Sequence, residues 1–147
     1  MLEGALKDIK HIIAGGFARD INHGKQPRDL DIIAVGATVE ELDKILDPYL
    51  DLNKVAPDLN YETCGRIIEV WALKGNIDVI LYDASTLREA IAMFDYNINQ
   101  YVCVGSQIEY WGENEGTLVR LREDLHPERI DKMEKIAKSL NWAVTGK

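Results

Sequence analysis

The chain has 147 residues, 46% of them hydrophobic and 29% charged, with only two cysteines, and this composition excludes a disordered protein and a disulfide framework. No apolar run approaches the roughly 18 residues of a membrane span, and the first ten residues lack the basic and apolar regions of a signal peptide, so we expect a cytoplasmic protein. The formal charge of −8 is uneven: residues 118–147 carry seven Lys or Arg against five Asp or Glu, whereas residues 1–117 carry ten against twenty. The acidic body argues against binding of a long nucleic acid there.

The hydrophobic pattern of the N-terminal half predicts alternating strands and helices. Two adjacent glycines, Gly15 and Gly16, are typical of a turn that opens a helix. Thr38 followed by Glu41 forms a capping-box pattern at the start of a second helix. The expected elements are a strand over 11–14, a helix over 17–24, a strand over 28–36, a helix over 39–46 and a loop over 50–63.

The second half continues with two hairpins and two helices. A second capping-box pattern joins Thr86 to Glu89, and Pro127 suits the first turn of a helix. The expected elements are strands over 66–73 and 77–83, a helix over 86–93, a hairpin over 97–112 that turns near Gly105 and Ser106, and an amphipathic helix over 126–144. This order predicts an α/β (α+β) fold, with a mixed sheet and helices packed against it, in one domain over 1–147. Its core would lie at 10–100, with a C-terminal hairpin and helix at 97–147.

The first hairpin also has an expected register. If Gly75 and Asn76 form a two-residue turn, cross-strand partners share a face and Leu73 lies opposite Asp78. The same register pairs Trp71 with Ile80 and Glu69 with Tyr82. The core face would then consist of Ile68, Val70, Ala72, Ile77, Val79 and Leu81, with Asp78 on the other side.

Two carboxylates occupy alternate positions at the start of the second strand. Residues i and i+2 of a strand point to the same face, so Asp29 and Asp31 would lie about 7 Å apart at the backbone. Two unpaired carboxylates at this distance repel, and a shared cation removes the repulsion. Mg²⁺ prefers a few carboxylates together with phosphate oxygens of a substrate. The pattern therefore predicts a metal site for a nucleotide, while Leu30, Ile32 and Ala34 face the core.

The double glycine supplies a complementary feature. A strand that enters a glycine turn and then a helix presents backbone N–H groups and the positive end of the helix, both of which favour phosphate. Gly15 and Gly16 lie close in sequence to Asp29 and Asp31. The glycine turn and the two carboxylates would therefore face the same point between neighbouring strands.

These residues resemble a known family. The segment GGFARDINHGKQPRDLDII is similar to the GG…RD…G…DxD signature of the DNA polymerase β-like nucleotidyltransferase superfamily, particularly the head domain of CCA-adding enzymes and small stand-alone phage nucleotidyltransferases. FDYNINQ at 94–100 resembles the DFTINA stretch of the CCA-adding head domain. NIDVIL at 76–81 is similar to the strand that carries the third carboxylate of the superfamily, here Asp78. The resemblance covers most of residues 11–100 and implies the polymerase β-like fold, with a mostly antiparallel sheet.

The resemblance also implies a reaction, the transfer of a nucleoside monophosphate from a triphosphate such as ATP or CTP to an acceptor, with release of pyrophosphate. Asp29, Asp31 and Asp78 would be the catalytic and metal-binding carboxylates, holding two Mg²⁺ ions for which Mn²⁺ can substitute. Asp78 could also take the proton of the acceptor hydroxyl. The acceptor would be an RNA or tRNA 3′ end, a small molecule or a protein.

The remaining site residues would bind the nucleotide. The resemblance implies that Gly15 and Gly16 cradle phosphates and that Arg19 and Arg28 neutralise charge on the leaving pyrophosphate. Asn97 and Asn99 are candidates for the sugar or base, although asparagines are also common in turns. Arg19 and Asp20 could equally form a structural ion pair.

One departure from the family, together with the acidic body, keeps a second interpretation open. The two arginines that precede the CCA-adding stretch are Met93 and Phe94 in this chain. Together with the acidic body, this change is compatible with a catalytically silent protein that uses the fold as an acidic interaction module. The basic residues of 118–147 would form a mixed-charge face or contact an RNA end.

Overall fold

The computed structural model describes residues 2–54 and 66–144. Most of the expected loop at 50–63, and Cys64, lie outside these residues. The helices are α1 (Leu2–Ala5), α2 (Gly16–Asn22), α3 (Val39–Leu46), α5 (Leu87–Ala92) and α6 (Pro127–Ser139), with short 3₁₀ turns η1 (Asp47–Tyr49) and η2 (Asn97–Asn99). The strands are β1 (Lys10–Ala14), β2 (Leu30–Val35), β3 (Ile67–Leu73), β4 (Ile77–Tyr82), β5 (Tyr101–Val104), β6 (Gln107–Tyr110), β7 (Thr117–Leu118) and β8 (Ala143–Val144).

Six strands form one mixed sheet in the order β3-β4-β2-β1-β5-β6. β2 and β4 run parallel, whereas the other neighbours are antiparallel. This arrangement confirms the predicted α+β class and the mostly antiparallel sheet. A small parallel pair, β7 with β8, was not predicted, because two-residue strands carry no periodic signal.

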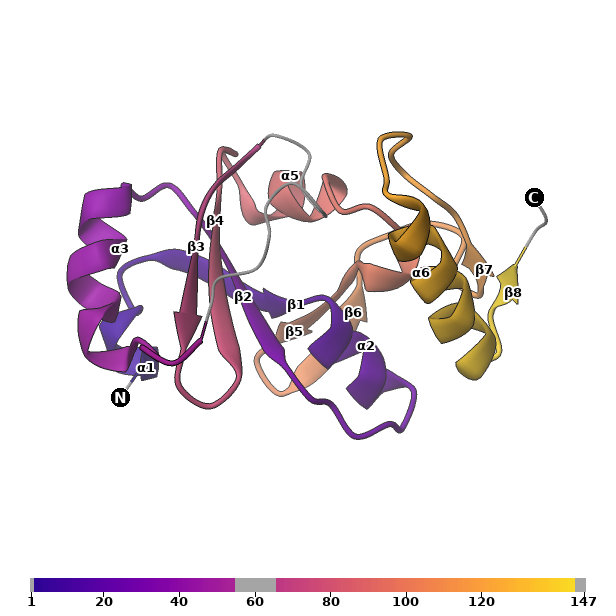
Figure 1. Ribbon diagram of the computed structural model, residues 1–147, viewed down its shortest axis with the longest axis horizontal. Coiled ribbons are helices and arrows are strands. Elements are labelled where there is room, and N and C mark those ends of the chain that lie inside the picture. Colours follow the sequence, from indigo (N-terminus) through magenta and orange to yellow (C-terminus); the bar gives the residue numbers. More distant parts are fainter. Residues whose placement is uncertain (1, 55–65, 145–147) are drawn as a thin grey trace.

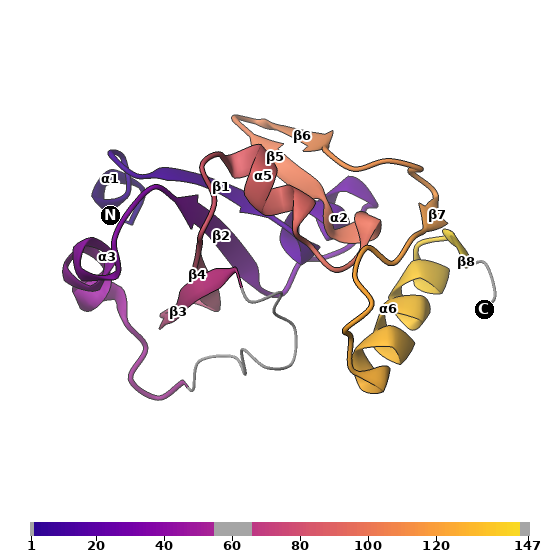
Figure 2. The same ribbon diagram turned by 90° about the horizontal axis from the view of Figure 1, so that it is seen from above.

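Apolar side chains cover both faces of the sheet. One face packs against α1 and α3 through Leu6, Leu42, Leu46, Ile32, Ala34, Trp71, Leu73, Val79 and Leu81. The other face packs against α5 through Ala14, Ile33, Val35, Tyr82, Ala90, Ile91 and Val102. Figure 1 shows α1 and α3 at one end of the molecule and α6 with β7 and β8 at the other, and the view from above in Figure 2 agrees. Within the described residues, no helix combines the length and apolar character needed to cross a lipid bilayer.

Local signals determine the N-terminal elements. The Thr38 hydroxyl accepts a hydrogen bond from the Glu41 N–H, and the Glu41 carboxylate accepts one from the Thr38 N–H, so the predicted capping box is present and α3 has the predicted limits. At α5 only one of the two hydrogen bonds of the predicted capping box is present. Thr86 accepts from the Glu89 N–H, but the Glu89 carboxylate accepts from the Ser85 N–H.

The register expected for the β3–β4 hairpin is wrong by one residue. Leu73 pairs with Ile77, and Ala72 pairs with Asp78, because the connection is the three residues 74–76 and not two. Gly75 and Asn76 both adopt positive φ, at 82° and 59°. Val70 and Ala72 therefore lie on the Asp78 face, whereas Trp71 and Leu73 lie on the core face with Val79 and Leu81. A β-bulge near Ile68 pairs Glu69 with Leu81, away from the Asp78 face.

The last helix is shorter than predicted. α6 ends at Ser139, and Asn141 adopts a left-handed φ of 64°. The Trp142 N–H donates to the Ala137 carbonyl and the Asn141 N–H to the Lys138 carbonyl, which is the Schellman pattern of a helix terminus. This turn redirects the chain and buries Trp142 in a third apolar cluster, formed with Ala18, Tyr96, Ile98, Tyr101, Leu118, Leu125, Met133, Ala137 and Leu140.

The Schellman turn gives a first test by substitution. We expect Asn141→Val to lower the free energy of unfolding by about 1–2 kcal/mol, because a β-branched residue tolerates the left-handed conformation poorly. Asn141→Gly should be close to neutral. Urea unfolding of both variants checks the prediction, and equal losses for Val and Gly would contradict it.

Candidate active site

A cleft of about 690 Å³ opens on the α5 face of the sheet, between the ends of β2 and β4 on one side and α6 on the other. Its volume lies within the usual range for small-molecule sites. The polar residues that line it are Gly15, Gly16, Arg19, Asp20, Lys25, Arg28, Asp29, Asp31, Asp78, Asp95, Asn99, Arg129, Lys132 and Ser139. Eight of the nine predicted site residues are in this list, and the exception is Asn97.

Strand pairing brings the three predicted carboxylates to one side of the cleft. β2 and β4 are parallel in a register that places Asp31 beside Asp78, so the two side chains share a face of the sheet. Asp29 directly precedes β2 and is exposed, whereas Asp31 is half-buried. Ile32 and Ala34 point into the opposite core, as the alternation predicts.

Asp78 has an environment that the sequence did not reveal. Its Oδ1 is buried without a hydrogen-bond partner among the described residues, and the Lys54 ammonium lies 3.8 Å from it. Burial raises the pKa of the Asp78 carboxyl above its usual value; Lys54 acts in the opposite direction, and Asp29 adds to the rise. Lys54 also donates to the Leu73 carbonyl at 3.1 Å, which fixes it beside the carboxylate.

The raised pKa of Asp78 predicts how stability depends on pH. A carboxyl with a higher pKa in the folded state than in the unfolded state favours folding fully below the unfolded value of 3.8, and this contribution is lost as the pH rises through the folded value. We therefore expect Asp78→Asn, measured with a chelator present, to be more stable than the parent at pH 7, with the difference vanishing below about pH 3.8. Thermal unfolding from pH 3 to 8 provides the measurement. A variant that is less stable at pH 7 would show that the pairing with Lys54 outweighs burial.

The carboxylates suit an oxygen-preferring divalent cation in chemical type, and the buried Asp78 Oδ1 is an acceptor that lacks a donor. Within residues 2–54 and 66–144, no group of three or more His, Cys, Asp or Glu side chains is arranged to hold a metal ion. Lys54 supplies the positive charge next to Asp78. Among the three carboxylates, Asp29 and Asp31 are therefore the ones that would hold such an ion.

The glycine turn lies next to these carboxylates. Gly15 has a φ of 81°, which favours glycine, and a Cβ built there would lie 3.8 Å from Asp31 Oδ2. Its N–H donates to the Tyr101 carbonyl at 3.0 Å, so it is not available to a ligand. The N–H groups left for an anion are those of the first helical turn, beginning at Gly16. A Cβ at Gly16 would approach the Arg19 guanidinium to 3.2 Å, so this glycine gives Arg19 its space.

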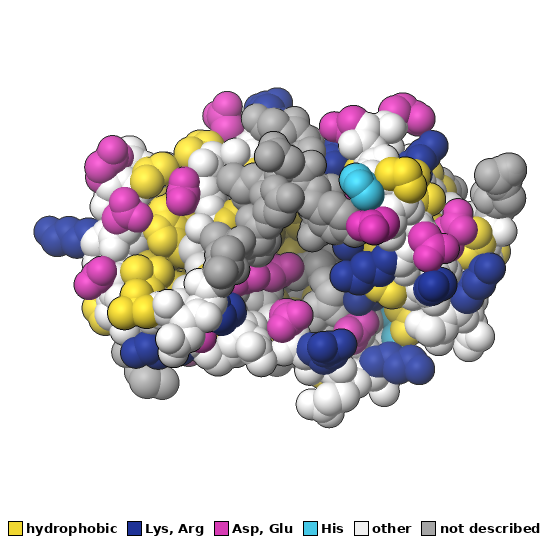
Figure 3. Space-filling model, viewed as in Figure 1, with side chains coloured by type: hydrophobic (Ala, Val, Ile, Leu, Met, Phe, Trp, Pro, Cys, Tyr) yellow, Lys and Arg dark blue, Asp and Glu magenta, His cyan; other side chains and the backbone are white. Residues whose placement is uncertain are grey.

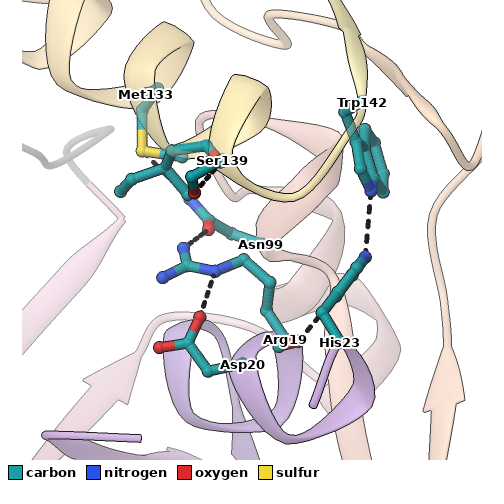
Figure 4. A network of polar contacts seen from close by, with 8 residues as sticks. Arg19, Asp20, His23, Asn99, Met133, Ser139 and Trp142 are labelled. Carbon is teal, nitrogen blue, oxygen red and sulfur yellow. Dashed lines mark hydrogen bonds and ion pairs between the residues drawn. The ribbon is translucent and has the colours of Figure 1, made fainter. Parts of the chain in front are cut away.

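Arg19 is held in a chain of polar contacts, and Figure 4 shows those that it makes with Asp20 and Asn99. Its Nε donates to Asp20 at 3.0 Å and its Nη1 to the Asn99 side-chain oxygen at 2.7 Å. The Asn99 amide in turn donates to Asp95 at 3.2 Å, and Asp95 accepts from Arg129 Nε at 2.7 Å. Asp95 and Arg129 are 6% and 9% exposed, so the pair is buried. Arg19 therefore forms the ion pair with Asp20 and also lines the cleft.

Asn97 lies elsewhere. Its amide nitrogen donates to the carbonyls of Glu113 and Thr117, and its oxygen accepts from the Val119 N–H at 2.7 Å. The side chain is 1% exposed. Asn97 therefore fixes β7 and the residues on either side of it, and it does not line the cleft.

The cleft has a basic side that the sequence indicated only in part. Arg129 and Lys132 of α6 line it together with Lys25, which precedes β2, although α6 reads in sequence as a mixed-charge face. Figure 3 shows acidic side chains near the middle of this view of the molecule and Lys or Arg side chains beside them, toward α6. Met93 and Phe94 add apolar surface to the cleft.

Comparison with known proteins supports the fold. No protein-family model and no curated protein sequence matches the chain. The Thermotoga maritima CCA-adding enzyme complexed with tRNA matches 99% of the chain with a TM-score of 0.60 and 16% identity. The Bacillus stearothermophilus CCA-adding enzyme in complex with CTP matches 98% of the chain with a TM-score of 0.59 and 16% identity. A tRNA-processing enzyme matches 99% of the chain with a TM-score of 0.61 and 21% identity.

These matches cover 38%, 39% and 43% of the three solved chains, so the present chain spans less than half of their length. At such low identity the likeness concerns the fold. It extends over nearly the whole chain. The chain therefore has the polymerase β-like nucleotidyltransferase fold, and the resemblance to CCA-adding enzymes is confirmed.

Proposed function

We propose that this protein is a nucleotidyltransferase, which transfers a nucleoside monophosphate from a nucleoside triphosphate to an acceptor hydroxyl and releases pyrophosphate. One observation carries the proposal: three carboxylates, from β4, from β2 and from the residue that precedes β2, line the same cleft as the glycine turn and five Lys or Arg side chains. A carboxylate group beside a basic, glycine-lined wall suits a metal–triphosphate complex.

The basic wall would bind the triphosphate. Arg19 is well placed for this role, because Asp20 and Asn99 orient its guanidinium and little entropy would be lost on binding. Gly16 would allow phosphate to approach the first turn of α2, and Arg28 would meet the leaving pyrophosphate from the mouth of the cleft. Asn99 would act through Arg19, which occupies its side-chain oxygen.

The carboxylates would serve the reacting groups. Asp29 and Asp31 would hold Mg²⁺, and two bound ions would supply a lower pKa of the acceptor hydroxyl and charge neutralisation on the triphosphate. Asp78 could accept the proton of the acceptor, because burial raises its pKa and makes it a stronger base than an ordinary aspartate.

ATP or CTP is the proposed donor, and an RNA or tRNA 3′ end is the preferred acceptor, ahead of a small molecule or a protein. The matching structures that contain CTP, ATP or tRNA support this order. We place the reaction in the cytoplasm and assign it to residues 1–147 as one domain.

The decisive experiment uses nucleoside triphosphates labelled at the α or the γ phosphate. The protein is incubated with Mg²⁺, total cell extract and each nucleotide in turn, and RNA, protein and small metabolites are then separated. We expect α label, but not γ label, to enter RNA, and a chelator to prevent it. Absence of α-label transfer to any fraction with every nucleotide would contradict the proposal.

The contact between Lys54 and Asp78 favours a second candidate, a catalytically silent acidic module, because the lysine already neutralises the third carboxylate. Mn²⁺ titration distinguishes the two. An enzyme should bind Mn²⁺ more tightly with a nucleoside triphosphate present, whereas a silent module need not bind either.

A further inference from the structure

His23 joins two elements that are far apart in the sequence. It caps the C-terminal end of α2, and its Nδ1 lies 2.7 Å from the Arg19 carbonyl oxygen. On its other side, Trp142 Nε1 donates to His23 Nε2 at 3.0 Å (Figure 4). Trp142 is 6% exposed and follows α6 through the Schellman turn. One imidazole therefore connects α2 to the segment that follows α6.

The two contacts define the protonation state of His23. A carbonyl oxygen can only accept, so Nδ1 carries a hydrogen and donates to Arg19. An indole N–H can only donate, so Nε2 must be the unprotonated acceptor. Only a neutral imidazole with its hydrogen on Nδ1 satisfies both partners, and protonation would place two N–H groups against each other.

The groups around His23 come from several elements. Arg19 and Asp20 lie on α2 itself, and the Arg19 guanidinium is directed away from the imidazole to Asp20 and Asn99. From β5, the Tyr101 ring packs edge-on against His23 at 5.4 Å between ring centres. The Tyr101 hydroxyl donates to Glu115 at 2.6 Å, and the Tyr110 ring of β6 packs against Tyr101 at 4.7 Å. Among these side-chain types, histidine is the one that ordinarily changes charge between pH 5 and 8.

The position of this contact gives it a consequence for the cleft. α2 carries Arg19 and Asp20 on one wall, and α6 carries Arg129, Lys132 and Ser139 on another. We propose that neutral His23 is a positioning residue, which sets the separation of α2 and α6 through Trp142 and so keeps Arg19 directed at the bound triphosphate. This proposal rests on the proposed nucleotidyltransferase function, and it adds that nucleotide binding weakens when His23 is protonated.

The first test concerns the contact itself and needs no activity. The indole N–H resonance of Trp142, identified by its loss in Trp142→Phe, is followed by NMR from pH 8 to 5. We expect it to shift with a histidine titration in the parent protein and not in His23→Gln, whose side-chain oxygen can still accept. A resonance that does not move in the parent would overturn the proposal whether or not the protein is an enzyme.

The second test concerns the cleft. We expect Trp142→Phe, which removes the N–H donor together with the five-membered ring, to raise the KM for the triphosphate about threefold to tenfold at pH 7.5 with little change in kcat, as for loss of one hydrogen bond. The parent should show a similar rise in KM between pH 7.5 and 5.5, and both Trp142→Phe and His23→Gln should lack it.

Trp111→Phe is the matched control, because that indole donates to Glu109 on the surface. If the protein transfers no nucleotide, the affinity for a non-hydrolysable triphosphate replaces KM. Parent-like KM and pH dependence in Trp142→Phe would overturn the positioning role.

Discussion

Replacing both Asp29 and Asp31 by Asn is expected to lower transfer of the α label by about 10³-fold or more while the chain remains folded. Cation binding at a reacting phosphate is worth several kcal/mol, and each 1.36 kcal/mol corresponds to a factor of ten in rate. Asp29 is exposed and Asp31 half-buried, and neither belongs to an apolar cluster, so the substitutions should not disturb the core. Initial rates at saturating Mg²⁺ and far-UV circular dichroism provide the two measurements.

A control pair separates site chemistry from the overall charge. Asp8→Asn with Glu40→Gln removes the same number of negative charges from exposed positions outside the cleft. This double variant should keep parental activity. Retained labelling in the Asp29 and Asp31 double variant would remove the proposed site.

Substitution of Arg19 should act on nucleotide affinity. We expect Arg19→Met to raise the KM for the triphosphate about 10-fold to 100-fold, because a hydrogen bond to a charged group contributes roughly 1.5–3 kcal/mol. Arg19→Lys should recover only part of this loss, since lysine cannot contact Asp20, Asn99 and a phosphate with one planar group.

The matched control is Arg120→Met. Arg120 is an exposed arginine that pairs with Glu123 and does not line the cleft. Its substitution should leave KM unchanged. If Arg19→Met bound the triphosphate as tightly as the parent protein, the ion pair with Asp20 would be the whole role of Arg19.

The sequence predicted well the features that depend on neighbouring residues. The limits of α3 follow from the capping box of Thr38 and Glu41, which the structure contains. The glycine turn and the alternation of Asp29 and Asp31 with apolar residues likewise place these groups correctly at one cleft. The capping box depends on residues three apart, and the meeting of the glycine turn with Asp31 depends on the pairing of two strands that follow one another in the chain, β1 and β2.

Features that depend on distant contacts were missed. Lys54 reaches Asp78 because the segment just before it bonds to the end of β3, where Asp51 N–H donates to the Ala72 carbonyl. The Asp95–Arg129 pair joins residues 34 positions apart. The expected hairpin register was wrong because Lys74 also belongs to the turn, which has three residues. The composition of this segment does not distinguish a three-residue turn from a two-residue turn. Asn97 was expected near the nucleotide, but its bonds to Glu113 before β7 and to Val119 after it are invisible in sequence.

The parallel register of β2 and β4 has a consequence for how this protein can vary. Asp31 and Asp78 meet because they lie opposite one another, and successive strand residues alternate between faces. A single insertion or deletion within β4 ahead of Asp78 would turn that carboxylate toward the hydrophobic layer under α3 and bring Ile77 or Val79 to the cleft. Length changes in homologous chains should therefore be confined to the connecting loops, while these two strands keep a fixed number of residues.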